Sequence, residues 1–218
     1  TRYYLNGIYM HISDTTDLTA VATDGHRLAL SQMKAPSGSE IMPSVILPRK
    51  AVLELRKLLD DESQEIDMQL SESRAEFSVG DIRLTTKLID GSFPDYKRVI
   101  PTGNDKTISI NVDILSAAVD RVSTIASDKS RAIKLNIGSG QLVLSATNPD
   151  ASSATETLEI EYKGETIDIG FNARYLMDIL TQIKGQVIAI ELADSGSPSL
   201  LRDPEDDTNI FVLMPMRV

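Results

Sequence analysis

The residues best suited to chemistry in this chain are an aspartate and a histidine separated by a single residue. Asp24 and His26 stand two positions apart, and Ser31 follows them. If these residues lay on strands, the carboxylate and the imidazole could share a face, as a base and its orienting group. Asp24-Gly25 is also a typical turn pair, because glycine readily adopts positive φ. A turn followed by a strand therefore explains these residues without catalysis, and a β-rich hydrolase remains the alternative.

The rest of the sequence carries none of the common patterns of a catalytic or metal site. Neither His11 nor His26 stands at a metal-ligand spacing, and the chain contains no cysteine. There is also no glycine-rich phosphate loop and no G-x-S-x-G nucleophile elbow. We therefore expect no catalytic residue, no metal site and no cofactor.

The charge of the chain is strongly negative but unevenly distributed. A formal net charge of −10 favours solubility and, if evenly spread, argues against nucleic acid as a partner. The acidic stretches 60–62 and 203–207 fall in predicted loops, whereas residues 48–59 hold one acidic residue, Glu54, and four cations, Arg49, Lys50, Arg56 and Lys57. Such a basic surface on an acidic protein could contact phosphates without reading bases.

The absence of cysteine also fits a reducing compartment, and we expect a cytoplasmic protein. No apolar run approaches the length of a membrane span. The chain starts at a threonine within a strand-like pattern, so we expect upstream sequence to have been removed.

An apolar C-terminal segment, residues 212–218, is the second feature that suggests binding. Methionine side chains are flexible and polarizable, which suits a surface that accepts several apolar partners. Pro215, between Met214 and Met216, removes a backbone donor and favours an edge or groove over a central strand. The alternative is that Ile210, Val212, Met214 and Met216 form one face of a final strand packed into a core.

A strand–helix–strand–strand–strand pattern recurs about every sixty residues and predicts an α+β fold. Segments 107–115 and 166–174 alternate polar and apolar residues and then reach a helix-capping Asn or Asp. The predicted helices run over about 113–126 and 173–184, and a third, opening at Pro48, runs to about residue 59. The predicted strands that follow them are 64–71, 75–80 and 82–88; 132–137, 141–146 and 155–162; and 186–192, 199–202 and 209–216.

Residues 3–12, 18–22 and 27–33 read as the three strands of a fourth repeat, whose first strand and helix would precede Thr1. Since two repeats make one domain, we expect a truncated domain over residues 1–103 and a complete one over 104–218, joined by a short linker near residues 102–105.

The chain resembles the bacterial DNA polymerase III beta subunit family, the replicative sliding clamps. Four motifs carry the resemblance in the same order and spacing: RYYLNG at 2–7, TDGHRL at 23–28, DGSFPDY at 90–96 with Arg98 and Val99, and VLMPMR at 212–217. The resemblance implies a DNA clamp fold, with helices lining a hole around duplex DNA and antiparallel sheets outside. It also implies a non-enzymatic processivity factor, a ring-shaped homodimer of three-domain subunits, of which this chain corresponds to the second and third domains.

In the family, a cleft receives short linear peptides from polymerase subunits, the clamp loader and repair proteins. The matching positions, with Arg2 added near the start of the chain, are Leu5, Thr23, Gly25, His26, Arg27, Leu28, Pro94, Arg98, Val99, Val212, Met214, Pro215, Met216 and Arg217. The segment Gly196-Ser-Pro198 and terminal Val218 differ from the commonest family pattern, which leaves the shape of the cleft rim open.

The resemblance also implies sequence-independent contact with duplex DNA and an interface between subunits. Arg49, Lys50 and Lys57 match the DNA-contacting positions, and Thr124 and Ile125 match the subunit contact, where the family often carries larger apolar residues. Ring closure joins the first domain of one subunit to the last domain of the other, so this chain alone should be monomeric or weakly associated. A generic protein-binding module is the second alternative, besides the hydrolase. The recurrence of basic helices at a fixed period favours the clamp over this module.

Overall fold

The structure is a computed structural model that describes residues 2–14, 16–59, 64–127, 131–150 and 152–218. It separates into two compact units, Thr1–Tyr96 (the N-terminal unit) and Lys97–Val218 (the C-terminal unit). The acidic stretch 60–62 lies outside the described residues. Among the helices of the described residues, none is both long enough and apolar enough to cross a membrane.

The N-terminal unit opens with an antiparallel sheet in the order β4-β1-β2-β3. Its strands are β1 (Gly7–Ile12), β2 (Asp17–Thr23), β3 (Arg27–Lys34) and β4 (Val45–Pro48). Tyr9 pairs with Val21, which pairs in turn with Leu30, and side chains alternate between the two faces. Val21 and Leu30 are buried, as the alternating pattern predicts.

The predicted strand from residue 3 is wrong at its start, because Tyr3–Leu5 form a 3-10 helix, η1. The amides of Leu5 and Asn6 donate to the carbonyls of Arg2 and Tyr3, at 3.0 Å each. The strand starts only at Gly7, where β4 approaches so closely that a Cβ atom would lie 2.2 Å from the Leu47 carbonyl oxygen. That backbone approach depends on tertiary packing, which the local sequence pattern does not report.

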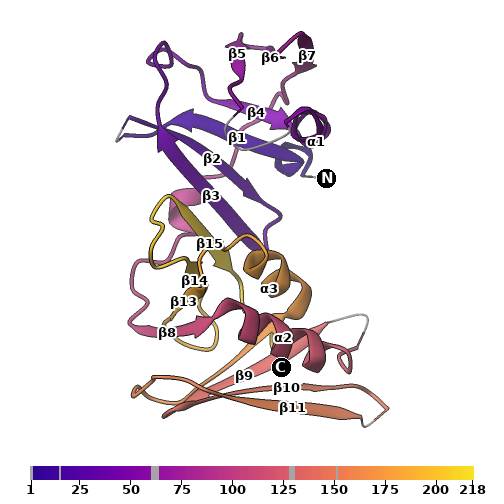
Figure 1. Ribbon diagram of the computed structural model, residues 1–218, viewed down its shortest axis with the longest axis vertical. Helices are drawn as coiled ribbons and strands as arrows, with labels where there is room; N and C mark the ends of the chain where they lie inside the picture. Colours follow the sequence, from indigo (N-terminus) through magenta and orange to yellow (C-terminus); the bar gives the residue numbers. More distant parts are fainter. Residues whose placement is uncertain (1, 15, 60–63, 128–130, 151) are drawn as a thin grey trace. The chain divides into compact units, whose positions relative to one another are not determined.

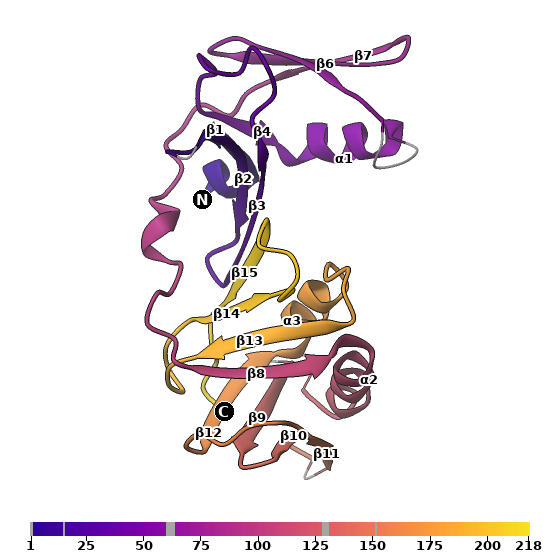
Figure 2. The same ribbon diagram turned by 60° about the vertical axis from the view of Figure 1, so that its left-hand side comes forward.

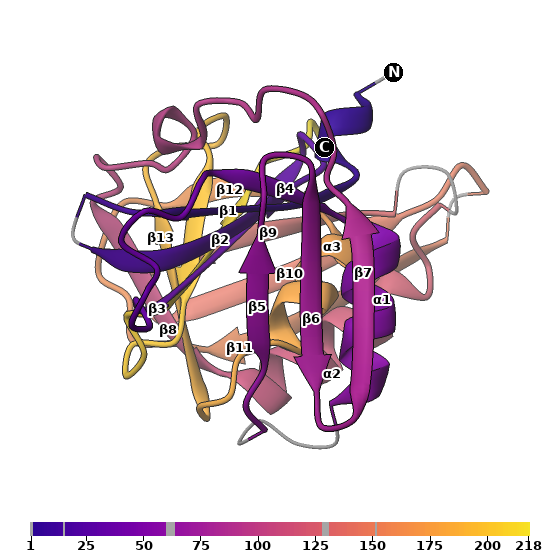
Figure 3. The same cartoon turned by 90° about the horizontal axis from the view of Figure 1, so that it is seen from above.

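Helix α1 (Arg49–Leu58) follows β4 directly and leads to a second, three-stranded sheet. The sheet contains β5 (Asp67–Leu70), β6 (Arg74–Val79) and β7 (Ile82–Lys87), which lie side by side in Figure 3 with α1 next to β7. A small core of Leu47, Ala75 and Phe77 joins the sheet to the inner face of the helix, where Val52 and Leu55 are partly buried.

The C-terminal unit contains two complete repeats. The first is β8 (Lys106–Asn111), α2 (Val112–Ser123), β9 (Ala132–Gly138), β10 (Gln141–Thr147) and β11 (Ser153–Glu159). The second is β12 (Ile167–Asn172), α3 (Ala173–Leu180), β13 (Val187–Leu192), β14 (Ser199–Arg202) and β15 (Asn209–Leu213). Each opening strand joins the sheet of the other repeat, giving the orders β11-β10-β9-β12 and β15-β14-β13-β8.

One large core holds the C-terminal unit together. Ile133, Leu135 and Ile137 on β9 are buried to 1% exposure or less, and Leu115 and Leu176 bring the two helices onto them. Helices α2 and α3 pack against each other and contact strands of both sheets (Figures 1 and 2). Burial of this many branched side chains is the main stabilising contribution to the unit.

The predicted α+β class and the strand–helix–strand–strand–strand repeat are confirmed in both units. Strand β4 pairs with β1 in the N-terminal unit as β12 pairs with β9 in the C-terminal unit. Among the described residues no strand pairs with the outer edge of β5, the edge that β8 takes beside β13.

Several predicted helices and strands extend a few residues beyond the ends that the structure shows. Helices α2 and α3 stop at Ser123 and Leu180, where bonds of the 3-10 type take over, as from Ile125 N–H to the Val122 carbonyl. Strand β11 ends at Glu159 and strand β15 ends at Leu213. Pro215 has no N–H group, so it cannot donate a backbone hydrogen bond that would extend β15.

Candidate functional site

An open depression on the N-terminal unit is lined by all four cations of the basic segment 48–59. Its volume is about 660 Å³, and it is lined by Asn6, Arg49, Lys50, Leu53, Glu54, Arg56 and Lys57. We call this feature the α1 depression. Four of its seven lining side chains are cationic and one is a carboxylate, so its field favours an anion.

The helical period of α1 explains how these side chains come together. Residues 49 and 50 occupy the first turn, and residues 53, 56 and 57 follow at spacings of three and four, which place them on one face. Ala51 follows Lys50 in the sequence but lies on another face of the helix, where it is buried. The helix start is anchored by the Arg49 amide, which donates to the Asn6 carbonyl at 3.0 Å.

The N-terminus of α1 carries charges that oppose its own dipole. Pro48 is the N-cap, no side chain caps the first turn, and the first turn has no acidic residue. Arg49 and Lys50 therefore stand at the positive end of the helix dipole, an arrangement that a bound anion would relieve. Lys57 Nζ lies 2.9 Å from Glu54 Oε1, whereas Arg49, Lys50 and Arg56 make no ion pair with any residue that the structure describes.

The structure thus brings the three predicted DNA-contacting residues together and adds others. Arg56 was not among the predicted contacts, although its spacing of seven residues from Arg49 could have identified it. Asn6 comes from the loop before β1, and nothing in the sequence pattern links it to the helix.

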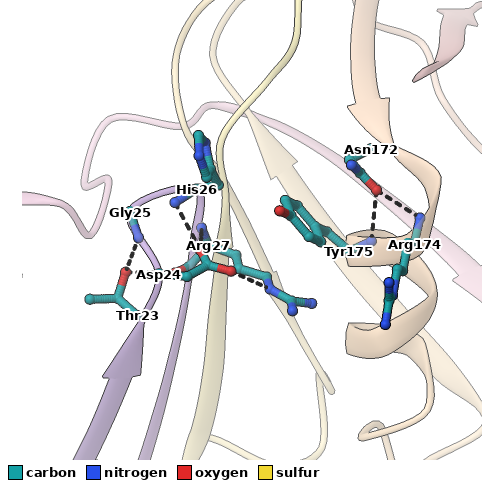
Figure 4. A network of polar contacts seen from close by, with 8 residues as sticks. All are labelled: Thr23, Asp24, Gly25, His26, Arg27, Asn172, Arg174 and Tyr175. Atoms are coloured by element: carbon teal, nitrogen blue, oxygen red, sulfur yellow. Dashed lines mark hydrogen bonds and ion pairs between the residues drawn. The ribbon is translucent and has the colours of Figure 1, made fainter. Parts of the chain in front are cut away.

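Residues 24–26 form a turn between β2 and β3 and not a strand. The Asp24 Oδ1 atom accepts the N–H groups of His26 at 2.9 Å and Arg27 at 3.1 Å, and Asp24 Oδ2 pairs with Arg27 Nε at 3.0 Å (Figure 4). The Thr23 hydroxyl donates to the Arg27 carbonyl at 2.7 Å and accepts the Gly25 N–H at 3.1 Å. Gly25 has a φ of 89°, as the turn requires.

This turn removes the basis of the hydrolase alternative. Burial alone would raise the pKa of Asp24, but the N–H groups of His26 and Arg27 and the Arg27 guanidinium outweigh it and hold the pKa below its ordinary value. The carboxylate therefore accepts the backbone N–H groups of His26 and Arg27 and pairs with the Arg27 guanidinium. The premise that Asp24 and His26 share the face of a strand is wrong.

The second histidine, His11, is buried and hydrogen-bonded within the N-terminal unit. His11 is buried, its Nδ1 lies 3.0 Å from the Ile12 carbonyl oxygen, and its Nε2 lies 2.8 Å from Tyr96 Oη. Because a carbonyl oxygen can only accept, Nδ1 donates to the Ile12 carbonyl. Phe93 stacks on Tyr9 with 4.8 Å between ring centroids. These contacts hold the segment that carries Pro94, a predicted peptide-contacting residue, against β1.

The other predicted peptide-contacting residues of the N-terminal unit lie near the turn at residues 24–26 or on β3, the strand that follows it. A Cβ atom on Gly25 would lie 2.9 Å from Arg2 Nη1, so Arg2 reaches the turn. Leu5 is half-buried on η1, and His26 is exposed. Leu28 is 3% exposed, so it can contribute only a small area to a bound peptide in this conformation.

In the C-terminal unit, the predicted peptide-contacting residues differ greatly in exposure. Arg98, at the end of the 3-10 helix η2 (Tyr96–Arg98), and Arg217 are exposed, and Val99 is 40% exposed. Val212 is fully buried on β15. The three residues Met214, Pro215 and Met216 are half-buried beyond the strand.

The end of the chain is held against β12. Met216 N–H donates to the Gly170 carbonyl at 2.8 Å, and the two residues form an isolated antiparallel bridge. A Cβ atom at position 170 would lie 2.4 Å from Val218 Cγ1 and 2.6 Å from the Met216 carbonyl oxygen. The alternative that one final strand contains all four apolar residues is wrong, since Met214 and Met216 follow its end.

The predicted subunit-contact residues also lie past a helix end. Thr124 is the C-cap of α2, is exposed, and donates from Oγ1 to the Asp120 carbonyl at 3.1 Å. Ile125 is half-buried. Both N-caps of this unit are asparagines: Asn111 accepts from Ile114, and Asn172 accepts from Arg174 and Tyr175 (Figure 4). Within the described residues, no group of three or more His, Cys, Asp or Glu side chains could hold a metal ion.

Comparison with known proteins identifies both units. Residues 1–95 match the model of the DNA polymerase III beta subunit, central domain, and residues 97–217 match that of the C-terminal domain. The chain is 48% identical to the beta sliding clamp of Caulobacter vibrioides and 41% identical to that of Pseudomonas putida, covering all of this chain and 59% of each relative. The chain thus spans about three fifths of the length of the curated relatives it matches.

Solved structures give the same result for the fold. A sliding clamp (DNA polymerase III subunit beta) from Bartonella birtlesii bound to griselimycin is 51% identical, with a TM-score of 0.96 over 100% of this chain and 59% of that one. A clamp structure from Pseudomonas aeruginosa with ligand is 38% identical, with a TM-score of 0.95 over the same shares. The prediction of a DNA clamp fold is confirmed.

Proposed function

The chain belongs to the DNA polymerase III beta subunit family, and we propose that the whole protein is a sliding clamp that encircles duplex DNA. In this role it tethers replicative and repair polymerases for processive synthesis and catalyses no reaction itself. The observation that carries the proposal is the α1 depression, in which four cations of an acidic protein face one hollow. We place the protein in the bacterial cytoplasm, where a DNA polymerase subunit would act.

The chemistry of the α1 depression favours phosphate over base recognition. Lysine and arginine side chains on a helix surface contact phosphates, which position a protein without carrying sequence information. Each neutralised phosphate contributes about −0.9 to the slope of log K against log salt for duplex DNA. DNA binding should therefore be weak, independent of sequence and strongly dependent on salt.

The test is DNA binding by a triple variant, Arg49→Ala, Lys50→Ala and Lys57→Ala. We expect the salt slope to flatten by about 2 to 3, because up to three phosphate contacts are lost. The matched control replaces Lys34, Arg74 and Lys87, three exposed cations that do not line the depression, and gives the same net charge. Fluorescence anisotropy with labelled duplexes at several salt concentrations measures the slopes. Equal slopes for both triple variants, or a strong preference for one DNA sequence, would contradict the proposal.

We also propose that the predicted peptide-contacting residues bind short linear peptides of polymerase subunits, the clamp loader and repair proteins. Support comes from the exposed Val99 and from the half-buried Met214 and Met216, whose flexible side chains can adapt to different apolar partners. Burying two or three peptide side chains gives about 1.5–3 kcal/mol each, offset in part by ordering the peptide. Micromolar affinity, about −8 kcal/mol, is the expected result.

The peptide proposal is tested with a labelled peptide that has a glutamine, a leucine and a terminal Leu-Phe pair. Deletion of residues 214–218 should cost several kcal/mol of binding free energy, provided that circular dichroism shows a folded protein. Val99→Ser avoids the folding question, because the side chain is already 40% exposed. Ile114→Ser, at a 54% exposed position on α2 outside the predicted set, is the matched control. Equal affinities for the wild type and both the deletion and Val99→Ser would contradict the assignment.

Finally, we propose that the full-length protein forms a ring-shaped homodimer and that this chain alone is monomeric or weakly associated. A head-to-tail contact needs two different surfaces, and the last domain supplies only one of them, around Thr124 and Ile125. Light scattering on the 218-residue chain measures its mass directly. A tight dimer that slides on circular duplex DNA would contradict this part of the proposal.

A further inference from the structure

Glu54 is the one carboxylate among the side chains that line the α1 depression. Its Oε1 atom lies 2.9 Å from Lys57 Nζ, and the two side chains are 46% and 69% exposed. Both groups therefore reach the solvent from which a phosphate would approach. An anion that contacts Lys57 has to compete with Glu54 for the same ammonium group.

The position of Glu54 on the helix also places its charge among the other cations. Lys50 stands four residues before it and Lys57 stands three residues after it, so all three share one face of α1. An anion held in the depression would experience repulsion from the carboxylate as well as attraction from the cations. An exposed pair at this spacing is weak, so a phosphate can displace it at modest cost.

We propose that Glu54 limits the affinity of the α1 depression for phosphate, both by pairing with Lys57 and by repelling the bound anion. The inference rests on the proposed function, because a protein that moves along DNA needs phosphate contacts that form and break easily. Glu54 is a tuning residue in this view, and it keeps four cations from holding DNA in one place.

A purely structural role is the competing explanation. Helix α1 has no side-chain cap and buries one residue, Ala51, so an ion pair within the helix could serve only to stabilise it. Replacement by glutamine separates the two roles, since glutamine keeps the length and the helix propensity of glutamate while losing its charge. A structural role would change the unfolding midpoint and leave phosphate affinity as it is.

The first experiment measures binding of a labelled duplex of about 24 base pairs at several salt concentrations. It compares the wild type with Glu54→Gln, Lys57→Gln, the double variant, and Glu65→Gln. Glu65 is an exposed glutamate that does not line the depression, so Glu65→Gln controls for net charge. We expect Glu54→Gln to tighten binding about two- to fivefold at low salt and to steepen the slope by up to about 0.9. In the Lys57→Gln background the gain should shrink, because the pairing contribution is absent.

The second experiment titrates inorganic tripolyphosphate and follows the arginine and lysine side chains by NMR. Tighter tripolyphosphate binding by Glu54→Gln without duplex binding by any variant would support the inference while contradicting the proposed function. Salt-dependent duplex binding of equal strength in the wild type, Glu54→Gln and Glu65→Gln would overturn the inference and leave the proposed function intact. Binding of neither probe by the wild type or Glu54→Gln would overturn both.

Discussion

Helix α1 of the N-terminal unit and helices α2 and α3 of the C-terminal unit occupy equivalent places in the repeat, but they are built differently. Helices α2 and α3 begin with asparagine caps and bury five and four residues, whereas α1 has no side-chain cap and buries only Ala51. Helix α1 carries four cations and one carboxylate, while α2 carries Asp113, Asp120 and Arg121, and α3 carries Arg174 and Asp178.

The difference separates two uses of one structural element. In the C-terminal unit the helices hold two sheets together, so their sequences favour capping and burial. In the N-terminal unit the helix presents a charged face, and its sequence gives up both a cap and a favourable dipole interaction to do so. The missing cap and the unfavourable charges of α1 are what we expect if this helix binds anions at the expense of its own stability, as we propose.

The largest expected difference between the helices is in burial. Leu115→Ala in α2 should lower the free energy of unfolding of its unit by about 2–5 kcal/mol, because the side chain is fully buried in the core. Leu53→Ala in α1 should change stability by about 0.5 kcal/mol or less, because that side chain is 45% exposed. Urea unfolding followed by circular dichroism measures both. Equal losses would mean that α1 is as firmly packed as α2.

The caps should give the next largest effect. Asn172→Ala should cost about 1 kcal/mol of unfolding free energy, because the N–H groups of Arg174 and Tyr175 lose their acceptor. Asn172→Asp keeps an acceptor oxygen and serves as the control. If both variants were as stable as the wild type, the asparagine caps could not explain the contrast with α1.

Reversing a charge on α1 should stabilise the helix and impair its binding. Arg49→Glu places a negative charge at the N-terminus of α1, where the residues three and four positions along are the uncharged Val52 and Leu53, and should add about 0.3–1 kcal/mol at low ionic strength. The same variant should weaken DNA binding, since it removes one cation from the α1 depression. Thermal unfolding and anisotropy on the same preparation give both values. A variant that is less stable than the wild type would show that the dipole does not govern this helix.

The smallest effect concerns an ion pair that ties α2 to β11. The Arg121 guanidinium donates from Nε to Glu156 Oε2 at 3.0 Å and holds the pKa of Glu156 below its ordinary value of 4.5. A lowered pKa means that this contribution to stability is fully present above pH 4.5 and is lost as the pH falls through the folded-state pKa. Stability of the wild type and Glu156→Gln should therefore converge on acidification below pH 4.5. Parallel curves from pH 7 downwards would exclude the pair as a source of acid sensitivity.

The repeat was predictable because each copy combines an alternating strand with a helix start. Asn111 and Asn172 end their strands and act as the N-caps, as the sequence pattern predicts. The helix ends were less predictable, because Ser123 and Leu180 are followed by neither glycine nor proline. The start of β1 at Gly7 was missed because Gly7 meets the backbone of Leu47, forty residues away in sequence.

The candidate site likewise has features that the sequence predicts and features that depend on tertiary structure. Charge clustering predicted that Arg49, Lys50, Arg56 and Lys57 share one basic surface, because their positions follow from a helical period. The choice of three of them as DNA contacts came from the family resemblance and stays a prediction. The pairing of Glu54 with Lys57 depends on rotamers, and the burial of Leu28 and Val212 depends on packing between distant segments. Neither property can be read from residue type and spacing alone.

The contacts of Gly170 with the C-terminal residues predict how mutations at this position should behave. Its missing side chain leaves the space that Val218 fills, and its carbonyl holds Met216, so position 170 controls the C-terminal residues from the middle of a buried strand. If these residues bind peptides as we propose, a random-mutagenesis screen for loss of peptide binding should recover substitutions at Gly170, although a peptide need never touch it. Such mutants would resemble contact mutants in phenotype, and suppressors should arise among the last residues of the chain.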